Sequence, residues 1–455
     1  MSKTATMIRA VSHPSLAVAL LLPALLLPAL TGAAVTGLPQ VRYQLHQDPD
    51  TEVIEPLRRF AERGDRPSMR LLASRLVSQE QLDTTHEAIG WYWRAFDRGY
   101  GKPLALAGMS EIADRMPLFR EQIRTLLEQG LNQLDPLASD ETLNSVLDLF
   151  LVYPDLLPPE QVEQLIGQYR RACILGCRTL TYQARLLEAQ GLLEQAEQRY
   201  RQAMVRDARA VGLYSRMLGD DAFDGLLAVA QAHQDRLPEL PAEVVEMLAV
   251  TLTRTPRQHD NAILLWLDQA IAWGSFQALL AKAGYLLDHP DLFDHQAAFR
   301  LIEQIGVQDP DEAGFLRAQA LQVYQWPTLD PEAAQRQLQA LVPRHPDRVQ
   351  LALAQLHSSG GLDEPDHRTA LTLYQPLLAR HSAAAHYRVA ALYAGTRAMC
   401  PDPVKGYGYA RIAELLGSAR ARLLRQQLET SLSPEQQSRG QALVHLLRQR
   451  LEQSL

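Results

Sequence analysis

Small side chains recur at a constant interval in the C-terminal half of the chain, and a second side chain, usually larger and apolar, follows each of them four positions later. The small positions are 36 residues apart and are Ala262, Ala298, Ala334, Ala370 and Gly406. Their partners are Trp266, Ile302, Leu338, Tyr374 and the smaller Ala410. Residues four apart lie on one face of an α-helix, and a period in the thirties is typical of stacked helix–turn–helix units.

A second row of apolar or small positions lies about fourteen residues before the first. It comprises Leu248, Gly284, Ala320, Leu356 and Leu392. Prolines or paired glycines separate the two rows in each unit, and these residues end helices where a turn is needed. Each unit is therefore predicted to be helix, loop, helix, with the small residue letting a neighbouring helix approach closely.

The N-terminal half carries the pattern less regularly. Ala88 and Ala196 each begin a small–aromatic–small spacing, and they are 108 residues apart, three times the interval of the C-terminal half. The 66 residues from Ala196 to Ala262 break this register. We therefore expect an irregular unit or bend at 220–240.

Two segments resemble the Sel1-like subclass of tetratricopeptide (TPR) repeats. They are 88–99, with the order small, aromatic, small, glycine, and 384–417, in which Asp402-Pro403 should cap the second helix. The fold predicted is all-α, a right-handed α-solenoid of Sel1-like/TPR-like helix–turn–helix repeats. Its predicted divisions are a signal peptide (1–34), an N-terminal lead-in (35–56), N-terminal TPR/Sel1-like repeats (57–219), the irregular unit or bend (220–240), Sel1-like repeats with the 36-residue period (241–417) and C-terminal capping helices (418–455).

The first 34 residues have the features of an export signal. Lys3 and Arg9 precede an apolar run at 16–30, and small residues follow at 31–34. The run is about 15 residues long and contains two prolines, whereas a spanning helix needs about 20 apolar residues. Cleavage is therefore favoured over a retained transmembrane anchor. No cysteine directly follows the run to take a lipid.

Length and charge narrow the class of protein further. At 455 residues the chain is too long for one compact core, but a solenoid avoids this limit because each repeat packs only on its neighbours. The formal net charge of −7 argues against nucleic acid as a partner.

No motif for catalysis, cofactor binding or metal binding is found. The chain has no GxSxG, Walker A, GxGxxG or HExxH sequence, and its thirteen histidines are scattered. Cys173 and Cys177 are four residues apart and lack a second pair to complete a metal site, so buried thiols or one local disulfide are favoured. Cys400 is expected in a loop. We predict no enzyme activity, no cofactor and no metal.

Exposed aromatic and basic side chains are the candidates for partner binding. In the last repeat these are Lys405, Tyr407, Tyr409 and Arg411, with Tyr407 and Arg411 on one helix face. In the N-terminal half they are Trp91 and Trp93. Tyrosine and arginine often anchor interfaces. The alternative is ordinary repeat packing, with Tyr407 pointing inward and Arg411 solvated.

An export signal, a full-length Sel1-like array and a terminal helix together resemble the alginate biosynthesis protein AlgK family, over about residues 40–455. The resemblance implies a non-enzymatic periplasmic scaffold for exopolysaccharide (alginate) export, associated with the outer membrane of Gram-negative bacteria. It implies an outer-membrane polysaccharide exporter and other periplasmic polymer-handling proteins as partners. The alternatives are a polysaccharide-binding solenoid and a Sel1-like adaptor unrelated to alginate. That family usually has a lipid-bearing cysteine at the mature N-terminus, so here either a partner holds the chain at the membrane or the chain is a different Sel1-like periplasmic protein.

Export predicts a shortened and unlipidated chain. Mass spectrometry of the protein from a periplasmic fraction should show a start near Ala34 or Val35 and no acyl group, because small residues at 31–34 suit signal peptidase. Intact Met1 on a cytosolic protein would contradict the export prediction.

Overall fold

The computed structural model describes residues 39–41, 43, 53–79, 81–172, 178–254, 261–359, 361–362, 364–395 and 401–453. The predicted signal peptide (1–34) and Cys173, Cys177 and Cys400 lie outside these residues. The chain forms two compact units, Met1–Pro56 and Leu57–Leu455, and the second unit holds the helical array. No helix among the described residues is both long enough and apolar enough to cross a membrane.

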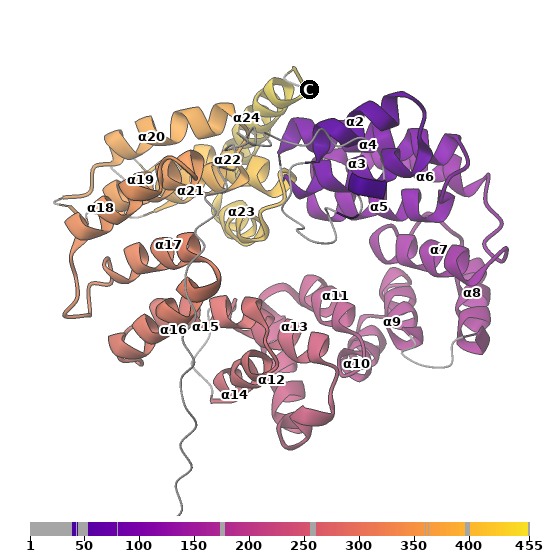
Figure 1. Cartoon of the computed structure of the whole chain (residues 1–455), viewed down its shortest axis with the longest axis horizontal. Coiled ribbons are helices and arrows are strands. Elements are labelled where there is room, and N and C mark those ends of the chain that lie inside the picture. Colours follow the sequence, from indigo (N-terminus) through magenta and orange to yellow (C-terminus); the bar gives the residue numbers. More distant parts are fainter. Residues whose placement is uncertain are drawn as a thin grey trace, which may run out of the picture. The chain divides into compact units, whose positions relative to one another are not determined.

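All the regular structure in the described residues is helical (Figure 1). The α-helices are α2 (Ile54–Glu62), α3 (Arg66–Ser78), α4 (Leu82–Asp97), α5 (Lys102–Arg115), α6 (Arg120–Leu131), α7 (Asp140–Val152), α8 (Pro159–Ala172), α9 (Thr179–Ala189), α10 (Leu193–Met204), α11 (Ala208–Leu218), α12 (Ala222–His233), α13 (Ala242–Leu252), α14 (Asn261–Ala272), α15 (Phe276–Asp288), α16 (His295–Gln308), α17 (Pro310–Ala320), α18 (Pro331–Leu341), α19 (Pro346–Ser359), α20 (His367–Ala379), α21 (Ala383–Ala394), α22 (Pro403–Leu415), α23 (Ala419–Ser431) and α24 (Pro434–Gln453). Three short 3₁₀ helices are η1 (Pro117–Phe119), η2 (Gly219–Asp221) and η3 (Gln234–Glu239).

Within the described residues, helices α3 to α22 form ten successive helix–turn–helix pairs, from α3/α4 to α21/α22. The two helices of every pair are in contact. We call the odd-numbered member the first helix of its pair and the even-numbered member the second helix. Helices α23 and α24 follow, and both pack against α22. The predicted all-α solenoid of Sel1-like/TPR-like helix–turn–helix repeats is confirmed.

The small positions of the 36-residue register all lie in second helices and are buried. The four alanines are at most 5% exposed. At the fifth position, a Cβ added to Gly406 would lie 3.4 Å from the carbonyl oxygen of Ala390 in the paired helix. The residues four positions on are buried as well: Trp266, Ile302, Leu338, Tyr374 and Ala410. The spacing in the sequence therefore marks the contact surface between neighbouring helices.

Two tryptophans tie equivalent positions of neighbouring repeats together. Trp266 donates its Nε1–H to the carbonyl of Ala230 at 3.2 Å, and Trp326 donates to the carbonyl of Pro290 at 3.2 Å. Each donor and acceptor are 36 residues apart. A buried indole needs a partner for its N–H, and the next repeat supplies it.

Charged side chains also connect neighbouring repeats, between α17 and α19. Arg348 forms a two-pronged ion pair with Glu312, with Nη2 2.8 Å from Oε1 and Nη1 2.5 Å from Oε2. Its guanidinium lies 3.9 Å from the ring centre of Phe315. His345 Nε2 contacts Asp311 Oδ2 at 2.8 Å. Paired and stacked arginine is better fixed in orientation than a single surface ion pair.

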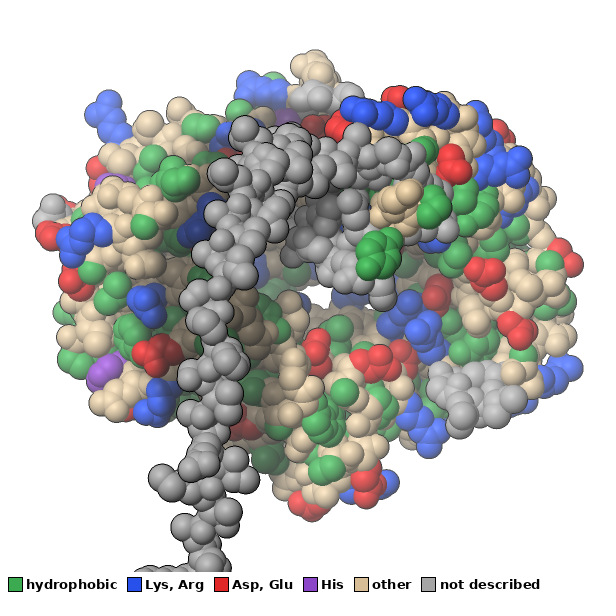
Figure 2. Space-filling model, viewed as in Figure 1, with side chains coloured by type: hydrophobic (Ala, Val, Ile, Leu, Met, Phe, Trp, Pro, Cys, Tyr) green, Lys and Arg blue, Asp and Glu red, His purple; other side chains and the backbone are tan. Residues whose placement is uncertain are grey.

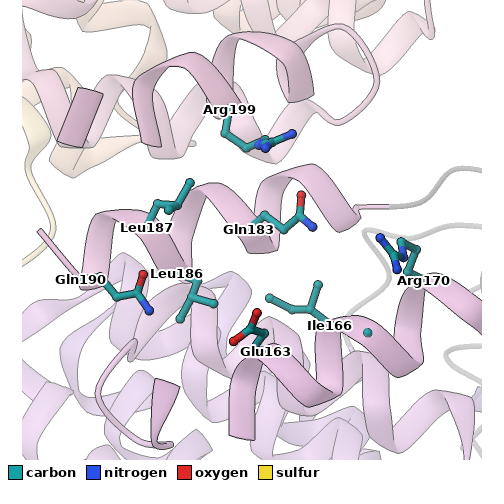
Figure 3. Close-up of a pocket in the computed structure, with 9 residues that line it drawn as sticks. Glu163, Ile166, Arg170, Gln183, Leu186, Leu187, Gln190 and Arg199 are labelled. Atoms are coloured by element: carbon teal, nitrogen blue, oxygen red, sulfur yellow. The ribbon is translucent and has the colours of Figure 1, made fainter. Parts of the chain in front are cut away.

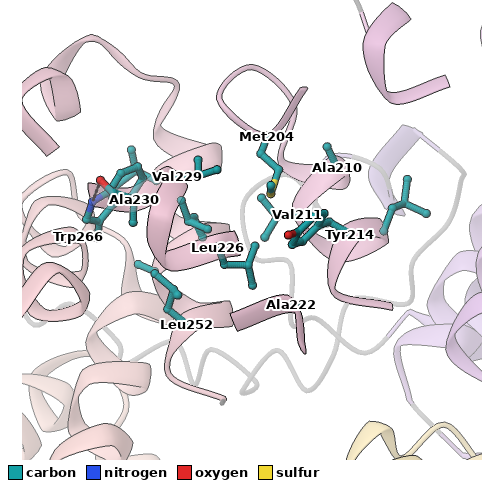
Figure 4. Close-up of a cluster of buried hydrophobic side chains, with 14 of the residues drawn as sticks. Met204, Ala210, Val211, Tyr214, Ala222, Leu226, Val229, Ala230, Leu252 and Trp266 are labelled. Carbon is teal, nitrogen blue, oxygen red and sulfur yellow. Dashed lines mark hydrogen bonds between the residues drawn. The ribbon is translucent and has the colours of Figure 1, made fainter. Parts of the chain in front are cut away.

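A continuous hydrophobic core runs from α7 to the loop after α17. Figure 4 shows part of it, where Met204, Tyr214 and Leu226 come from three successive helices. The segment predicted to be irregular, 220–240, contains the regular helix α12 followed by η3, and Leu237 of η3 is also in this core. Packing therefore continues through the break in register, while a bend at this point stays a prediction.

Helix ends in the last repeats follow the signals in the sequence. The Asp402 side chain accepts a hydrogen bond from the backbone N–H of Lys405 at 3.0 Å, and proline occupies the first turn. Ser433 and Gln436 bond reciprocally, at 2.9 Å and 3.3 Å, as a capping box does. Both predicted caps are confirmed.

Some turns between pairs pass through one residue with positive φ, followed by a serine that caps the next helix. These residues are Gly274 (φ 88°), His381 (φ 59°) and Gly417 (φ 100°). At Gly417 an added Cβ would lie 2.2 Å from the carbonyl oxygen of Arg115, at the end of α5. Glycine is required there both for the backbone conformation and for this close approach.

The register predicts which alanine cannot be enlarged. Ala298→Trp should lower the free energy of unfolding by about 1–3 kcal/mol, because the fully buried alanine has no space around it. Gln296→Trp, on an exposed position of the same helix, is the matched control. Chemical denaturation measures both, and equal stability of the two variants would contradict the assigned register.

Candidate functional site

Clefts recur at one kind of place along the array, between the second helices of successive pairs, and in three of them a first helix, α9 or α17, supplies part of the lining. In the described part of the chain, four such clefts bridge α4 and α6, α8 and α10, α10 and α12, and α16 and α18. Their volumes range from about 370 to about 550 Å³. Every one is lined by aliphatic side chains together with arginine and glutamine. The face made by the second helices is therefore the candidate site, and each cleft is named by the helices it bridges.

Two matching stripes of residues form the α8–α10 cleft. Helix α8 contributes Glu163, Ile166, Gly167 and Arg170, and the stretch beginning in α9 contributes Gln183, Leu186, Leu187 and Gln190. Both stripes have the spacing that places residues on one helix face. Figure 3 shows Arg170 at one end of the cleft and Gln190 at the other, with Ile166 and Leu186 between them. Arg199 of α10 lies above this floor.

The α8–α10 cleft combines an apolar floor with charges that have no partner among the described residues. Ile166 and Leu186 are buried, while Glu163 and Arg170 are exposed at the rim. A Cβ added to Gly167 would meet nothing within 4 Å, so this glycine leaves open space in the cleft. The cleft measures about 480 Å³, which is large enough for one or two side chains of a partner.

The α10–α12 cleft lies on the neighbouring side of α10. Its aliphatic lining is Leu180, Val205, Ala228, Val229 and Ala232, and its polar lining is Gln198, Arg201, Gln202, Arg206 and His233. Its volume is about 550 Å³. Arg199 Nη1 donates to Gln202 Oε1 at 3.4 Å, which links the rims of the two clefts. Arg201 is paired with Glu197 at 2.7 Å, whereas Arg206 has no partner among the described residues.

The α4–α6 cleft contains both tryptophans that the sequence offers as partner-binding candidates. Trp91 is 6% exposed, donates its Nε1–H to Glu87 at 2.8 Å and has the Arg94 guanidinium 4.6 Å from its ring centre. Trp93 is half-buried and stacks on Phe96 at 5.1 Å. The structure thus brings the two tryptophans to one cleft, with most of the Trp91 ring covered by packing.

Tyr407 points inward, which is the alternative that the sequence left open. It is 6% exposed and forms a small core with Val404, Leu428 and Leu432. A Cβ added to Gly440 of α24 would lie 2.7 Å from the Tyr407 ring, so helix α24 covers this side chain. Tyr407 stabilises the attachment of the last helix and is not available at the surface of the chain.

Lys405 and Tyr409 come together through a third residue, Tyr393. The Lys405 Nζ lies 3.2 Å from Asp402 Oδ2 and 5.2 Å from the centre of the Tyr393 ring, and Tyr393 stacks on Tyr409 at 6.0 Å. Hydrogen bonding to Asp402 raises the pKa of Lys405, so the lysine stays charged. Lys405 is half-exposed and remains a surface candidate.

Arg411 belongs to a separate network around Glu414. Its Nη1 lies 2.7 Å from Glu414 Oε2, and Arg425 Nε lies 2.8 Å from the same oxygen. Arg422 Nε approaches the other carboxylate oxygen at 3.6 Å. Three arginines therefore share a carboxylate that is mostly buried, and the Arg411 side chain, which is 40% exposed, pairs with this residue of its own helix.

Other chemistry is sparse in the described residues. No three histidine, cysteine, aspartate or glutamate side chains among them come together as a metal site would require. The exposed large aromatic side chains among the described residues are Tyr43, Trp273 and Tyr324, which are far apart in the sequence, with Trp273 and Tyr324 in turns. Figure 2 shows basic, acidic and hydrophobic side chains interspersed over one face.

Sequence reasoning missed the α8–α10 and α10–α12 clefts. The signal that could have found the first is the double stripe, in which two neighbouring helices repeat the same spacing with polar residues at both ends and a glycine in the middle. The packing register does not mark it, because that register records buried positions only.

Neither a protein-family model nor a curated protein matches this chain. Among solved structures, a sel1 repeat protein from Klebsiella pneumoniae subsp. pneumoniae is 17% identical, with a TM-score of 0.29, covering 44% of this chain and 99% of its own. A protective antigen of uropathogenic Escherichia coli with an SLR fold is 14% identical, with a TM-score of 0.22, covering 88% and 95%. A Sel1 repeat protein from Oxalobacter formigenes is 14% identical, with a TM-score of 0.25, covering 84% and 92%. At these TM-scores the neighbours decide nothing about function, and the repeat architecture stands on the helix pairs of the chain itself.

A buried histidine beside Tyr409 should make the stability depend on pH. Burial lowers the pKa of His386 to about 4, with its Nδ1 2.8 Å from the Ser382 carbonyl and the neutral Tyr409 ring 6.1 Å away. The unfolded chain takes up this proton below its ordinary pKa of about 6.5, so stability from this residue is complete above pH 6.5 and is lost as pH falls towards 4. The loss should be on the order of 2–3 kcal/mol.

The comparison with His386→Gln isolates this effect from the other histidines. Urea denaturation between pH 7.5 and 4 should show the wild type losing more stability than the variant, because glutamine does not titrate. Parallel stability curves for the two proteins would show that His386 is not buried in its neutral form.

Proposed function

We propose that this chain is a non-enzymatic scaffold that holds partner proteins on the face made by its second helices. The observation that carries this proposal is that clefts lined by aliphatic side chains together with arginine and glutamine recur in different repeats. Repeated grooves let one chain bind several segments of a partner at once, and linked segments bind more tightly than any one of them alone. Aliphatic pockets with a polar rim are typical of protein interfaces.

We further propose that the scaffold works in the periplasm, in exopolysaccharide export of the alginate type. The export signal at 1–34 and the likeness of the Sel1-like array to the AlgK family support this setting. The partners would be an outer-membrane polysaccharide exporter and other periplasmic polymer-handling proteins. The exporter would hold the scaffold at the outer membrane.

One observation favours a second function, direct contact with the polysaccharide. The α4–α6 cleft has Trp93 half-exposed on its wall, beside Glu87 and Gln122. A sugar ring can stack on an indole while carboxylate and amide groups bind its hydroxyls. The described exposed aromatics form no row along the array, so the scaffold function is the better supported of the two.

Deletion and co-purification test the scaffold function. In the native host, loss of the chain should abolish polymer secretion without abolishing polymerisation, and the tagged chain should co-purify with the outer-membrane exporter from a detergent extract. Gly212→Leu should leave co-purification unchanged, because Gly212 is a helical position with open space around it that lines none of the four clefts. Normal secretion by the deletion strain would contradict the proposal.

A further inference from the structure

The two clefts beside α10 differ in charge from the chain as a whole. Their lining contains Arg170, Arg199, Arg201, Arg206 and His233 but only one acidic residue, Glu163. The whole chain has a formal charge of −7. An excess of arginine on one surface of an acidic protein selects partners of negative charge.

The arginines of these clefts differ in whether their guanidinium groups have partners within the chain. Arg201 is bound to Glu197, and Arg199 contacts only the Gln202 amide at 3.4 Å. The guanidinium groups of Arg170 and Arg206 form no hydrogen bond or ion pair with any described residue. Guanidinium groups bind carboxylates in a two-pronged geometry, so these arginines are ready to receive carboxylates from outside the chain.

The floors of the two clefts indicate which uncharged groups the ligand carries. They are built from isoleucine, leucine, valine and alanine, with no phenylalanine, tyrosine or tryptophan in either lining. Aliphatic floors complement aliphatic side chains, whereas a sugar ring offers hydroxyl groups around its edge and packs its apolar face on aromatic rings. The shape and chemistry therefore favour a peptide over a polyuronate, although both carry carboxylates.

We infer that the clefts on either side of α10 bind an acidic, leucine-bearing segment of a partner protein. Aliphatic side chains of the segment enter the α8–α10 and α10–α12 clefts, and its carboxylates pair with Arg170 and Arg206. This inference rests on the proposed scaffold function and adds to it the surface and the chemistry of one partner.

Gly167 offers a variant that blocks the cleft without weakening the fold. A Cβ at this helical position meets nothing within 4 Å, so a leucine side chain enters the cleft itself. Leucine is a better helix former than glycine, and the melting temperature of Gly167→Leu should equal or exceed that of the wild type. Gly212→Leu is the matched control, because Gly212 is also helical with open space around it and lines none of the four clefts.

A second pair of variants tests the charges. The double variant Arg170→Glu with Arg206→Glu reverses the charge at the two arginines whose side chains have no partner. Arg171→Glu with Arg300→Glu makes the same change in net charge at exposed arginines outside the clefts. If Arg170 and Arg206 form specific ion pairs with the ligand, only the first double variant should lose much affinity for an acidic peptide. If the attraction is only general, both double variants should lose similar affinity.

The probe is a fluorescein-labelled peptide of alternating leucine and glutamate blocks, about 12 residues long, titrated with the purified chain and followed by fluorescence anisotropy. Binding should weaken with added salt, and Gly167→Leu and the Arg170/Arg206 pair should each weaken it at least about tenfold, as the loss of an anchor does. Gly212→Leu and the Arg171/Arg300 pair should stay within about threefold of the wild type.

Each contrary result overturns the inference. These are no binding to the wild type, equal binding of a leucine–lysine peptide, equal affinity of Gly167→Leu, or equal losses from the two charge pairs. Tighter binding of an oligouronate, lost in Gly167→Leu, would assign the clefts to polysaccharide. If Gly167→Leu cells still show normal co-purification of the exporter, only the cleft inference falls; if the wild type never co-purifies with it, the proposed export function falls whatever the peptide does.

Discussion

The close approach of neighbouring helices at one small side chain per repeat is the constraint on which the array depends. Ala298, Ala334 and Ala370 expose no surface, and Gly406 sits where a Cβ would crowd the backbone of the paired helix. Each repeat has little core of its own, so its stability comes from burial against the next repeat. The hydrogen bonds of Trp266 and Trp326 to carbonyls 36 residues earlier show that the same spacing also satisfies polar groups.

This constraint also generates the clefts. Small residues fix how closely the helices of the array pack, and the ridges of successive second helices then leave a groove wherever the side chains between them are short. Gly167 in the α8–α10 cleft and Gly90 in the α4–α6 cleft are such positions, because a Cβ added to either would meet nothing within 4 Å. The grooves are therefore a regular product of the fold, and the chain specialises them by changing the rim residues. Around α10 these are mainly arginine and glutamine.

The fold could be predicted because burial repeats. The 36-residue register, the cap at Asp402 and the box at Ser433 are local signals with a fixed physical meaning, and the structure has each of them. The N-terminal repeats were harder, because prolines interrupt the apolar pattern of the sequence between α5 and α8, at Pro117, Pro136, Pro154, Pro158 and Pro159. Apart from the α8–α10 cleft with its double stripe, the clefts could not be predicted, because they depend on which residues of two helices face each other across a gap.

The same reasoning explains why Tyr407, in the most regular repeat, is covered by packing. A repeat is recognised in the sequence by its buried positions. Tyr407 is one of these positions in the last repeat, where it packs beneath α24. A side chain that is needed for packing is covered, and a covered side chain cannot dock a partner. Binding residues are expected instead at rim positions, where the repeat pattern leaves the residue type free. Arg170 and Arg206 occupy such positions, and their charge is what a partner would meet first.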